Sequence, residues 1–594
     1  MNSTDTTLSA TEIAKAWLAD FGAALTGGDI EQALGLFDDT CFWRDFVAFT
    51  WNIKTVQGRE HVASMLEETL VRTAPTNWSV EGEAWEAGDY LEAFISFETA
   101  VGNGGGHLRL IGGKCRTLLT TLESLAGHEE KTGCRRIAGT THVVERGREN
   151  WLEKKTREEE RIGTEEQPWC LIVGGGQGGI ALAARLRRLD VPYLVIEKNP
   201  KAGDSWRNRY RSLVLHDPVW YDHMPYLPFP DDWPVFTPKD KMGDWLEAYV
   251  KIMELLYWTD CECRSASYDE QSERWNVEVE RGGDPLTLRP AHLVFATGAY
   301  GASKMADIPE REPFDGTIIH TNDYQSGSDY SGKRCAVIGS ASSAHDVAAD
   351  LWENGAVVTM IQRSPSIVVR SETLMELGFE ALYSESAVER GLDVEKADML
   401  AASVPYRMIP EVQKPIYEQI AKADADLYQK LTDAGFLWDF GEDNTGLMAK
   451  AMRTAAGYYI DVGASSLIAD GRIAIKSGAD IEAVIENGLA MCDGTTVDAD
   501  VIIHATGYKS LDDTIARLIS PEVSERVGKF WGYGSGVSGD PGPYEGELRN
   551  MWKPTAQEAL WFHGGNLALS RQFSKYLALQ LKARFEGMSI RVFG

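Results

Sequence analysis

Three glycines and one glutamate in the sequence are spaced to hold a dinucleotide. Gly174, Gly176 and Gly179 form the pattern G-x-G-x-x-G, and Glu197 follows further along the chain. In this pattern the first glycine makes a tight turn, the second lets the backbone approach a pyrophosphate, and the third lets a helix pack closely on a strand. An acid at the position of Glu197 accepts hydrogen bonds from the hydroxyls of an adenosine ribose. The spacing therefore predicts a dinucleotide with an unphosphorylated ribose.

The residues around these glycines have the pattern of a strand, a helix and a second strand. Residues 170–173 form a short apolar run that is typical of a buried strand. Apolar residues then recur at helical spacing over 180–189, and residues 193–196 form a second apolar run before Glu197. The start of such a helix offers free N–H groups and a partial positive charge to phosphates. All four parts occur in the right order, which favours dinucleotide binding over a merely flexible turn.

Residues 334–363 repeat this unit with a weaker glycine pattern. Gly339 keeps the first glycine, whereas Ala341 and Ala344 replace the other two. Alanine at the third place affects only helix packing, but at the second place it adds a methyl group where backbone meets pyrophosphate. We expect Ser340 and Ser342, in the same turn, to contact the cofactor.

The second unit ends with the opposite charge. Where the first unit has Glu197, the second has Gln362, Arg363 and Ser364. Loss of the acid together with a guanidinium and a hydroxyl favours a ribose that carries a 2′-phosphate. This predicts NADPH rather than NADH at the second unit, although an arginine after a strand is often only a surface charge.

An FAD site and an NADPH site in one chain predict hydride transfer from NADPH to the flavin. A disulfide, a quinone or oxygen can then accept the electrons; because the sequence has no C-x-x-C pair, we favour oxygen. The aromatic segment that includes Trp206 is expected to surround the flavin ring. Two A-T-G motifs are expected close to cofactor, and their residues are Thr297 and Gly298, and Thr506 and Gly507.

The segment between the two units matches F-x-G-x-x-x-H-x-x-x-Y through Phe314, Gly316, His320 and Tyr324. With the glycine motifs and A-T-G-Y, it makes the chain from about residue 165 onward resemble the flavin-containing monooxygenases, which are class B flavoproteins. The run LHDPVWYDHMPYLPFP is similar to the plant YUCCA type. The resemblance implies FAD, NADPH, oxygen and a small organic substrate, with a flavin C4a-hydroperoxide as the oxygenating species.

The resemblance also implies a catalytic region that contains His320, Tyr324 and Trp206. We expect His320 to position the fingerprint loop rather than act as a general base; a structural histidine is the alternative. Baeyer–Villiger relatives carry tryptophan in place of Tyr324, so tyrosine favours N- or S-oxygenation or oxidative decarboxylation of an indole-pyruvate-like keto acid. Two alternatives stay open: a Baeyer–Villiger monooxygenase, and a flavin-binding interaction protein whose NADPH site has decayed at Ala341 and Ala344.

Residues 1–150 have a different character. Ser9 and Glu12 form a capping-box pattern before a helix, and strand-like segments include 90–99. This order predicts an α+β cone, and the run CFWRDFVAFTWNIKTVQGREHVASML resembles SnoaL-like domains. Asp45 and His61 are conceivable acid–base groups, but we favour an auxiliary or dimerising role for the domain.

The predicted fold class is therefore α/β, with two Rossmann-like dinucleotide-binding domains after an α+β SnoaL-like cone. The predicted boundaries are 1–150 for the cone, 151–167 for a charged linker, 168–331 for the first part of the FAD domain, 332–500 for the NADPH domain with a helical insertion at 370–460, and 501–594 for the second part of the FAD domain.

Composition narrows the function classes. The chain has 594 residues, 43% of them hydrophobic, and a formal net charge of −30. This charge argues against nucleic acid and anionic membranes as partners, and no apolar run reaches the ~20 residues that span a bilayer. The 8 cysteines lack metal-ligand spacing, so we expect no metal. With no signal peptide visible, we predict a cytoplasmic enzyme, with a homodimer as the assembly to consider.

Overall fold

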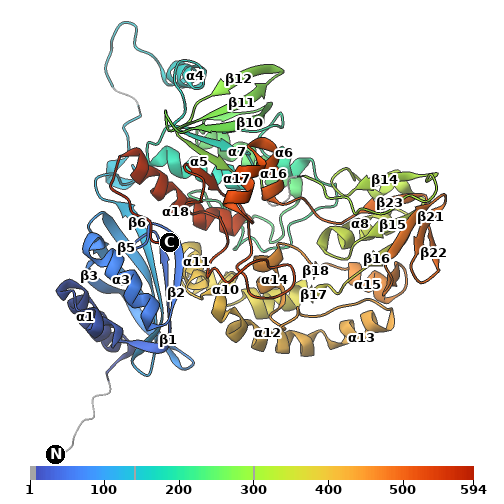
Figure 1. Cartoon of the computed structure of the whole chain (residues 1–594), viewed down its shortest axis with the longest axis horizontal. Helices are drawn as coiled ribbons and strands as arrows, with labels where there is room; N and C mark the ends of the chain where they lie inside the picture. Colours follow the sequence, from blue (N-terminus) through green and yellow to red (C-terminus); the bar gives the residue numbers. More distant parts are fainter. Residues whose placement is uncertain (1–7, 140–141, 299–301) are drawn as a thin grey trace, which may run out of the picture.

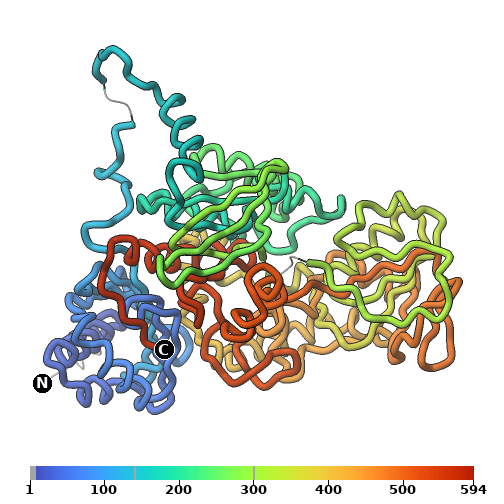
Figure 2. The backbone as a smooth tube through the Cα atoms, turned by 45° about the horizontal axis from the view of Figure 1, so that its top comes forward, coloured from blue at the N-terminus to red at the C-terminus, as the bar shows by residue number. Residues whose placement is uncertain are grey.

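The computed structural model describes residues 8–139, 142–298 and 302–594. The chain forms an N-terminal domain, two lobes that are each built on a parallel sheet, and a group of helices beneath them (Figure 1). The tube in Figure 2 shows the segment between the N-terminal domain and the first lobe as an arm that extends away from the body. The predicted α/β class with two Rossmann-like units is confirmed.

The N-terminal domain packs helices against a mixed sheet of order β2-β1-β6-β5-β4-β3, in which only β1 and β6 are parallel. The predicted capping box is present, because Ser9 and Glu12 bond reciprocally at the start of α1. The predicted strand at 90–99 is β4. The elements are α1 (Ala10–Gly27), α2 (Ile30–Leu34), β1 (Phe37–Phe46), β2 (Ile53–Gln57), α3 (Arg59–Thr73), β3 (Thr76–Ala87), β4 (Tyr90–Thr99), β5 (Gly102–Ile111), β6 (Lys114–Leu125) and η1 (Gly133–Arg135).

This domain is docked on the rest of the chain through buried polar contacts. Arg44 of β1 forms a bidentate pair with Glu547, with N–O distances of 2.6 and 2.7 Å, and also donates to the carbonyl of Ala402 at 2.6 Å. The amide of Phe593, next to the chain end, donates to the carbonyl of Thr50 at 2.8 Å. The exposed helix α4 (Trp151–Arg161) follows the extended arm and leads into the first lobe.

The first lobe contains a parallel sheet of order β24-β13-β7-β8-β9. Apolar runs without polar alternation form its central strands, because both faces are covered. Its elements are β7 (Cys170–Val173), α5 (Gln177–Arg188), β8 (Tyr193–Ile196), α6 (Asp204–Arg207), α7 (Lys239–Ile252), β9 (Tyr257–Trp258), β13 (His292–Phe295), α16 (Leu511–Leu518), α17 (Pro521–Val527), β24 (Leu560–Phe562) and α18 (Leu567–Phe585). A small antiparallel sheet joins it, made of β10 (Cys261–Asp269), β11 (Arg274–Arg281) and β12 (Asp284–Leu288).

The second lobe has a matching parallel sheet of order β14-β23-β15-β16-β19. Its elements are β14 (Thr317–His320), η2 (Gly327–Tyr330), β15 (Arg334–Ile338), α8 (Ser342–Glu353), β16 (Val357–Gln362), α15 (Ala464–Ala469), β19 (Ala474–Ser477), β20 (Ile481–Ile485), β21 (Gly488–Met491), β22 (Thr496–Asp498) and β23 (Val501–His504). Sheet membership places β14 and β23 in this lobe, although the predicted boundaries assign 317–320 and 501–504 to the FAD domain.

The predicted helical insertion leaves the second lobe from one parallel pair of strands, β17 (Ile367–Arg370) and β18 (Tyr458–Asp461). Its helices lie beneath both lobes and beside the N-terminal domain (Figure 1). They are α9 (Ser371–Leu374), the π-helical turn η3 (Met375–Phe379), α10 (Glu385–Glu389), α11 (Val394–Ala402), η4 (Tyr406–Met408), α12 (Ile409–Ala423), α13 (Ala425–Asp433) and α14 (Gly446–Thr454).

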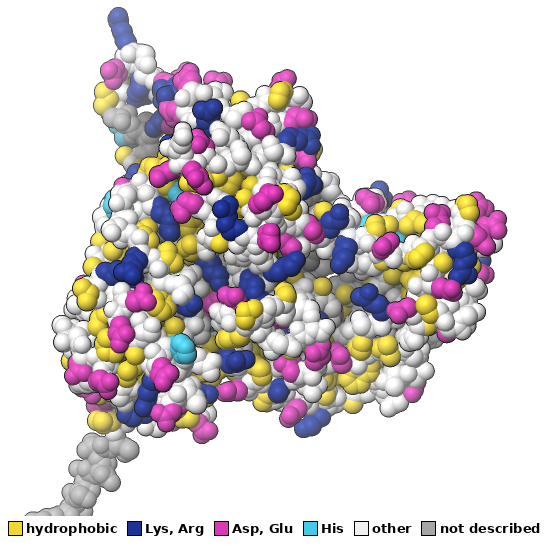
Figure 3. Space-filling model, in the orientation of Figure 1, with side chains coloured by type: hydrophobic (Ala, Val, Ile, Leu, Met, Phe, Trp, Pro, Cys, Tyr) yellow, Lys and Arg dark blue, Asp and Glu magenta, His cyan; other side chains and the backbone are white. Residues whose placement is uncertain are grey.

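The surface carries charges of both signs (Figure 3), and the cysteines form no disulfide bond. Acidic and basic side chains are interspersed on the face seen in Figure 3. All 8 cysteines are free thiols. Across residues 8–139, 142–298 and 302–594, no cluster of side chains has the make-up of a metal site, and no helix is long and apolar enough to cross a bilayer.

Candidate functional site

The first glycine turn has the backbone geometry that its sequence predicts. Gly174 has φ +107°, and a Cβ there would lie 2.6 Å from the carbonyl oxygen of Ala296. Gly176 is the last residue before α5, so the amides that begin the helix face the turn. A Cβ at Gly179 would lie 2.0 Å from the carbonyl oxygen of Gly174. These positions exclude larger residues and leave a cradle at the start of α5 that fits a pyrophosphate.

Glu197 lies beside this cradle, at the end of β8. Its side chain is buried, and Oε2 accepts a hydrogen bond from the amide of Gly175 at 2.8 Å. Oε1 accepts from the backbone and side-chain nitrogens of Asn199 at 2.9 and 2.6 Å. The carboxylate is therefore held at the rim of the glycine turn, where it can accept further hydrogen bonds from a ribose.

Segments far apart in the sequence meet at the start of α5. The side chain of Gln177 accepts from Trp206 Nε1 at 3.3 Å and donates to the carbonyl of Gly565 at 3.2 Å. Gly298 approaches Gly564 so closely that a Cβ on the latter would lie 4.0 Å from the Gly298 Cα. The buried hydroxyl of Thr297 has no hydrogen-bond partner among the described residues. A glycine cradle with an unpaired hydroxyl fits FAD, and the predicted cofactor contacts of Trp206, Thr297 and Gly298 stay predictions.

The second lobe repeats the turn with alanines. Gly339 has φ +129°, and a Cβ there would lie 2.5 Å from the carbonyl oxygen of Ala505. Ala341 precedes α8 with φ −99° and ψ −172°, close to the −74° and −169° of Gly176. Because an L-residue adopts these angles without strain, the backbone course is kept and only the methyl group is added. Ala344 is buried against the sheet.

The ends of the two central strands can be aligned by their hydrogen bonds. The amide of Gly174 donates to Ile196, and that of Gly339 donates to Ile361 at the same 2.9 Å. Gln362 is thus the counterpart of Glu197, and its amide group is bonded in both directions to the backbone of Leu437 at 2.7 Å. The acid is replaced by a buried amide that is hydrogen-bonded to the backbone.

Arg363 and Ser364 follow Gln362 at the exposed end of β16. Ser340 Oγ lies 2.8 Å from Ser366 Oγ, and Ser342 Oγ donates to the carbonyl of Tyr458 at 2.9 Å. A guanidinium and a hydroxyl beside a glycine turn fit a 2′-phosphate. These two serine hydroxyls contact the protein itself, and so their predicted role in cofactor binding stays a prediction.

His320 holds the second A-T-G loop. Its Nδ1 accepts from the amide of Asn322 at 3.0 Å, so Nε2 carries the proton and donates to the carbonyl of Gly507 at 2.9 Å. Burial lowers the pKa of this imidazole. The hydroxyl of Thr506 donates to the carbonyl of Lys304. With both nitrogens occupied, His320 is arranged to position the loop that carries Thr506 and Gly507.

Tyr324 lies in the core of the second lobe. It is fully buried, and its hydroxyl donates to Asp350 of α8 at 2.6 Å. The same carboxylate oxygen accepts the amide of Gly327 at 2.7 Å. Tyr210, from the first lobe, is 6.4 Å away between ring centroids. Trp206 belongs to α6 of the first lobe, and the predicted catalytic role of Tyr324 stays a prediction.

A polar cluster at the start of α18 includes a buried acid, Asp222, that the sequence does not point to. Asn566 caps this helix and donates to the hydroxyl of Tyr221 at 3.2 Å. Next to Tyr221, burial together with the charge of Asp217 raises the pKa of Asp222 well above its usual range. Acids in a proline- and aromatic-rich loop have no periodic signal, and so only their packing reveals them.

Asp45 and His61 of the N-terminal domain are not arranged as an acid–base pair. Asp45 is fully buried and accepts hydrogen bonds from Thr120, Thr50 and the amide of Phe49. His61 is exposed on α3 and bonds the carbonyl of Gln57 at 2.8 Å. These hydrogen bonds indicate a structural role for Asp45.

Comparisons with known proteins agree with this site. Residues 171–378 match the model of the pyridine nucleotide-disulphide oxidoreductase family. The indole-3-pyruvate monooxygenase YUCCA1 of Oryza sativa subsp. japonica is 28% identical over 346 residues, which are 58% of this chain and 77% of that protein. The probable indole-3-pyruvate monooxygenase YUCCA1 of Arabidopsis thaliana is 29% identical over 342 residues, which are 57% and 75% of the two proteins.

The fold is also similar to that of solved structures. A flavin monooxygenase from Stenotrophomonas maltophilia is 16% identical, covers 70% of this chain and 99% of its own, and has a TM-score of 0.46. A complex of OTEMO with FAD and NADP is 17% identical, covers 71% and 87%, and has a TM-score of 0.49.

Proposed function

We propose that this protein is a class B flavoprotein monooxygenase that consumes NADPH and holds FAD in its first nucleotide-binding unit. The observation that carries the proposal is the contrast between the two strand ends. A carboxylate, Glu197, follows the first, whereas an amide bonded to the backbone, Gln362, and then an exposed guanidinium, Arg363, follow the second. Relatives named as indole-3-pyruvate monooxygenases support the assignment as a monooxygenase.

When bound, FAD accepts a hydride from NADPH and activates oxygen, so that one oxygen atom can pass to a small organic substrate. The residues of this chain bind and orient. The amides that begin α5 would hold the FAD pyrophosphate and Glu197 its ribose, whereas Arg363 and Ser364 would hold the 2′-phosphate of NADPH. His320 keeps the Gly507 loop in place through its Nε2 proton.

Water must be kept from the reacting atoms. The helical insertion covers the loop of the first lobe that carries Tyr221. This ring packs against Phe379 and Tyr383 of the insertion, with ring centroids 5.4 and 4.8 Å apart. The substrate reaction is N- or S-oxygenation or the oxidative decarboxylation of a keto acid; the names of the relatives favour the last.

Rapid mixing of the anaerobic holoenzyme with NADPH or NADH tests the proposal. Fast bleaching of the flavin by NADPH and slow bleaching by NADH are expected. No bleaching by either coenzyme would leave the flavin-binding interaction protein as the better reading. Oxygen uptake and product analysis with an amine, a sulfide, a ketone and an α-keto acid then decide which oxygenation reaction the enzyme catalyses. An ester formed from the ketone would identify a Baeyer–Villiger enzyme.

We also propose a cytoplasmic location, an auxiliary N-terminal domain and a homodimer. The free thiols of all 8 cysteines support a cytoplasmic location. The N-terminal domain is auxiliary, which is supported by the structural place of Asp45. Light scattering on the purified holoenzyme tests the homodimer.

A further inference from the structure

A cavity of about 320 Å³ lies outside the nucleotide-binding turns. Its walls come from the loop 220–228, from residues 382–395 of the insertion, and from one side chain each of α5 and α18. Most of the lining is apolar or aromatic and includes Trp220, Tyr226 and Leu392. Arg185 of α5 and Arg571 of α18 are its buried cations. The cavity is large enough for a small organic ligand, whose sites begin at ~300 Å³.

Arg571 is largely committed to the protein. Its guanidinium forms a bidentate pair with Asp398, with N–O distances of 2.9 and 2.7 Å. Its remaining terminal nitrogen donates to the carbonyls of Tyr221 and His223 at 2.8 and 2.7 Å. Four of the five N–H donors of this arginine are therefore bonded to the protein, and its main part is to build the wall of the cavity.

Arg185 is buried but only loosely paired. Its side chain is 9% exposed, and its Nη1 lies 3.9 Å from Glu130 Oε1, which is beyond a hydrogen bond. Its Nε is buried without a hydrogen-bond partner among the described residues. The guanidinium lies 4.4 Å from the centre of the Tyr226 ring. A buried guanidinium is costly unless its donors are satisfied, so this side chain has unused capacity for an anion.

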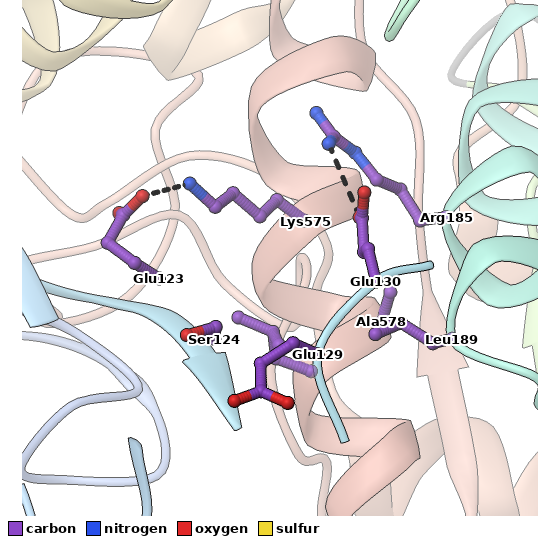
Figure 4. A pocket seen from close by; sticks show the side chains of 9 residues that line it. Glu123, Ser124, Glu129, Glu130, Arg185, Leu189, Lys575 and Ala578 are labelled. Atoms are coloured by element: carbon purple, nitrogen blue, oxygen red, sulfur yellow. Dashed lines mark hydrogen bonds and ion pairs between the residues drawn. The ribbon is translucent and has the colours of Figure 1, made fainter. Parts of the chain in front are cut away.

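Glu130 reaches Arg185 from the N-terminal domain. It lies in the segment that follows β6, and Figure 4 shows it and Arg185 pointing toward one another between that segment and α5. The hydroxyl of Tyr226 donates to the same Oε1. Glu130 itself does not line the cavity, and the acid that does, Glu395 of the insertion, is exposed. The carboxylate nearest to Arg185 thus belongs to a different domain from the arginine.

We propose that this cavity binds an organic carboxylate with an apolar body, and that Arg185 receives the carboxylate in place of its loose contact with Glu130. The apolar walls accept the body of the ligand, and the planar guanidinium suits the two oxygens. Glu130 competes for the same cation, so the N-terminal domain sets the affinity of the site. The proposal does not depend on oxygenation, because binding occurs without NADPH.

Calorimetric titration of the FAD-loaded protein, without NADPH, tests this site. Phenylacetate is the probe and phenylacetamide is its neutral match. We expect phenylacetate to bind at least 10-fold more tightly, since a hydrogen bond to a charged group changes affinity by roughly 10- to 100-fold. Arg185→Gln should remove this preference, and Arg185→Lys should retain part of it.

Glu130→Gln provides the sharper test, because it keeps an oxygen for Tyr226 and removes only the competing charge. It should tighten phenylacetate binding by roughly 3- to 10-fold. Glu129→Gln is the matched control, since Glu129 pairs with Arg135 at 2.9 Å instead, and it should leave binding unchanged. If Arg185→Gln loses its flavin or its native circular dichroism spectrum, the lysine variant and the comparison of the Glu130 and Glu129 variants decide whether Arg185 binds the carboxylate.

Equal binding of the acid and the amide, or equal behaviour of the Glu130 and Glu129 variants, would overturn the proposal. Carboxylate binding with no flavin reduction by NADPH would overturn the monooxygenase assignment and leave this site standing. A carboxylate that binds and stimulates NADPH oxidation is a substrate if an oxygenated product forms. It is an effector if no such product forms, and either outcome supports the site.

Discussion

Replacing Arg44 by alanine should loosen the N-terminal domain more than any surface substitution. The Arg44 and Glu547 side chains are 4% and 2% exposed and form a bidentate pair. The substitution leaves Glu547 buried with a hydrogen bond from Thr55 but without its bidentate ion-pair partner. It also removes the donor to the carbonyl of Ala402. Both losses weaken the docking of the N-terminal domain on the rest of the chain.

The size of the effect follows from burial. Removing one partner of a buried ion pair costs about 3–5 kcal/mol, whereas replacing both by apolar residues of similar volume is close to neutral. Arg44→Ala should therefore cost about 3–5 kcal/mol, and the double variant Arg44→Met with Glu547→Leu should recover most of that loss. Arg591 pairs with Glu68 at 3.9 Å with side chains 72% and 48% exposed, and so Arg591→Ala should change stability by at most ~0.5 kcal/mol.

Hydrogen exchange followed by mass spectrometry measures this locally, which suits a multidomain chain that need not unfold in one step. Peptides from β1 should exchange roughly a hundred to several thousand times faster in Arg44→Ala, since about 1.4 kcal/mol corresponds to a factor of ten. Exchange within tenfold of the wild type, or a double variant as labile as the single one, would refute the reasoning.

Four further outcomes are expected. Arg363→Ala should weaken NADPH by roughly 10- to 100-fold in steady-state kinetics and leave NADH unchanged, because only the 2′-phosphate bond is lost; equal losses would contradict the assignment. Glu197→Ala should lower the flavin content of purified protein, since it removes the ribose acceptor and leaves the bonded amides unpaired; normal FAD content would refute this. Ala341→Gly should tighten NADPH, because it removes a methyl group at the pyrophosphate; calorimetry checks it, and weaker binding would argue against that placement. Burial raises the pKa of Asp45 to about 6, so the folded state binds a proton more readily than the unfolded state, and stability falls as pH rises from ~4 to ~6, by about 2–3 kcal/mol. Burial lowers the pKa of His107 in the same domain to about 4, which acts in the opposite sense; the test is therefore the stability difference between the wild type and Asp45→Asn, which should favour the wild type increasingly as pH falls from 7 to 4.5.

The local features of the nucleotide-binding units could be read from the sequence. The tight turns at Gly174 and Gly339, the helices that follow them and the apolar strands depend on neighbouring residues only. The close approach of Gly179 to Gly174 is equally local, since one helical turn joins them. Residue type and spacing suffice here because the physical constraint acts within a few residues.

Contacts between distant segments were decided by tertiary structure. The counterpart of Glu197 is Gln362, and Arg363 comes one residue later; this depends on how two strands align with their glycine turns. The place of Tyr324 beneath α8 depends on the partner Asp350, which has no local signal.

By itself, the sequence determined two nucleotide-binding units of opposite strand-end charge, because glycine geometry and charge are properties of short segments. Only the tertiary structure decided that the N-terminal domain locks onto the body through Arg44 and Glu547, and that Glu130 faces Arg185 beside a cavity. The two residues of each pair are far apart in the sequence. They meet because whole domains pack against one another and bury both side chains, and the spacing of residues along the chain does not predict such packing.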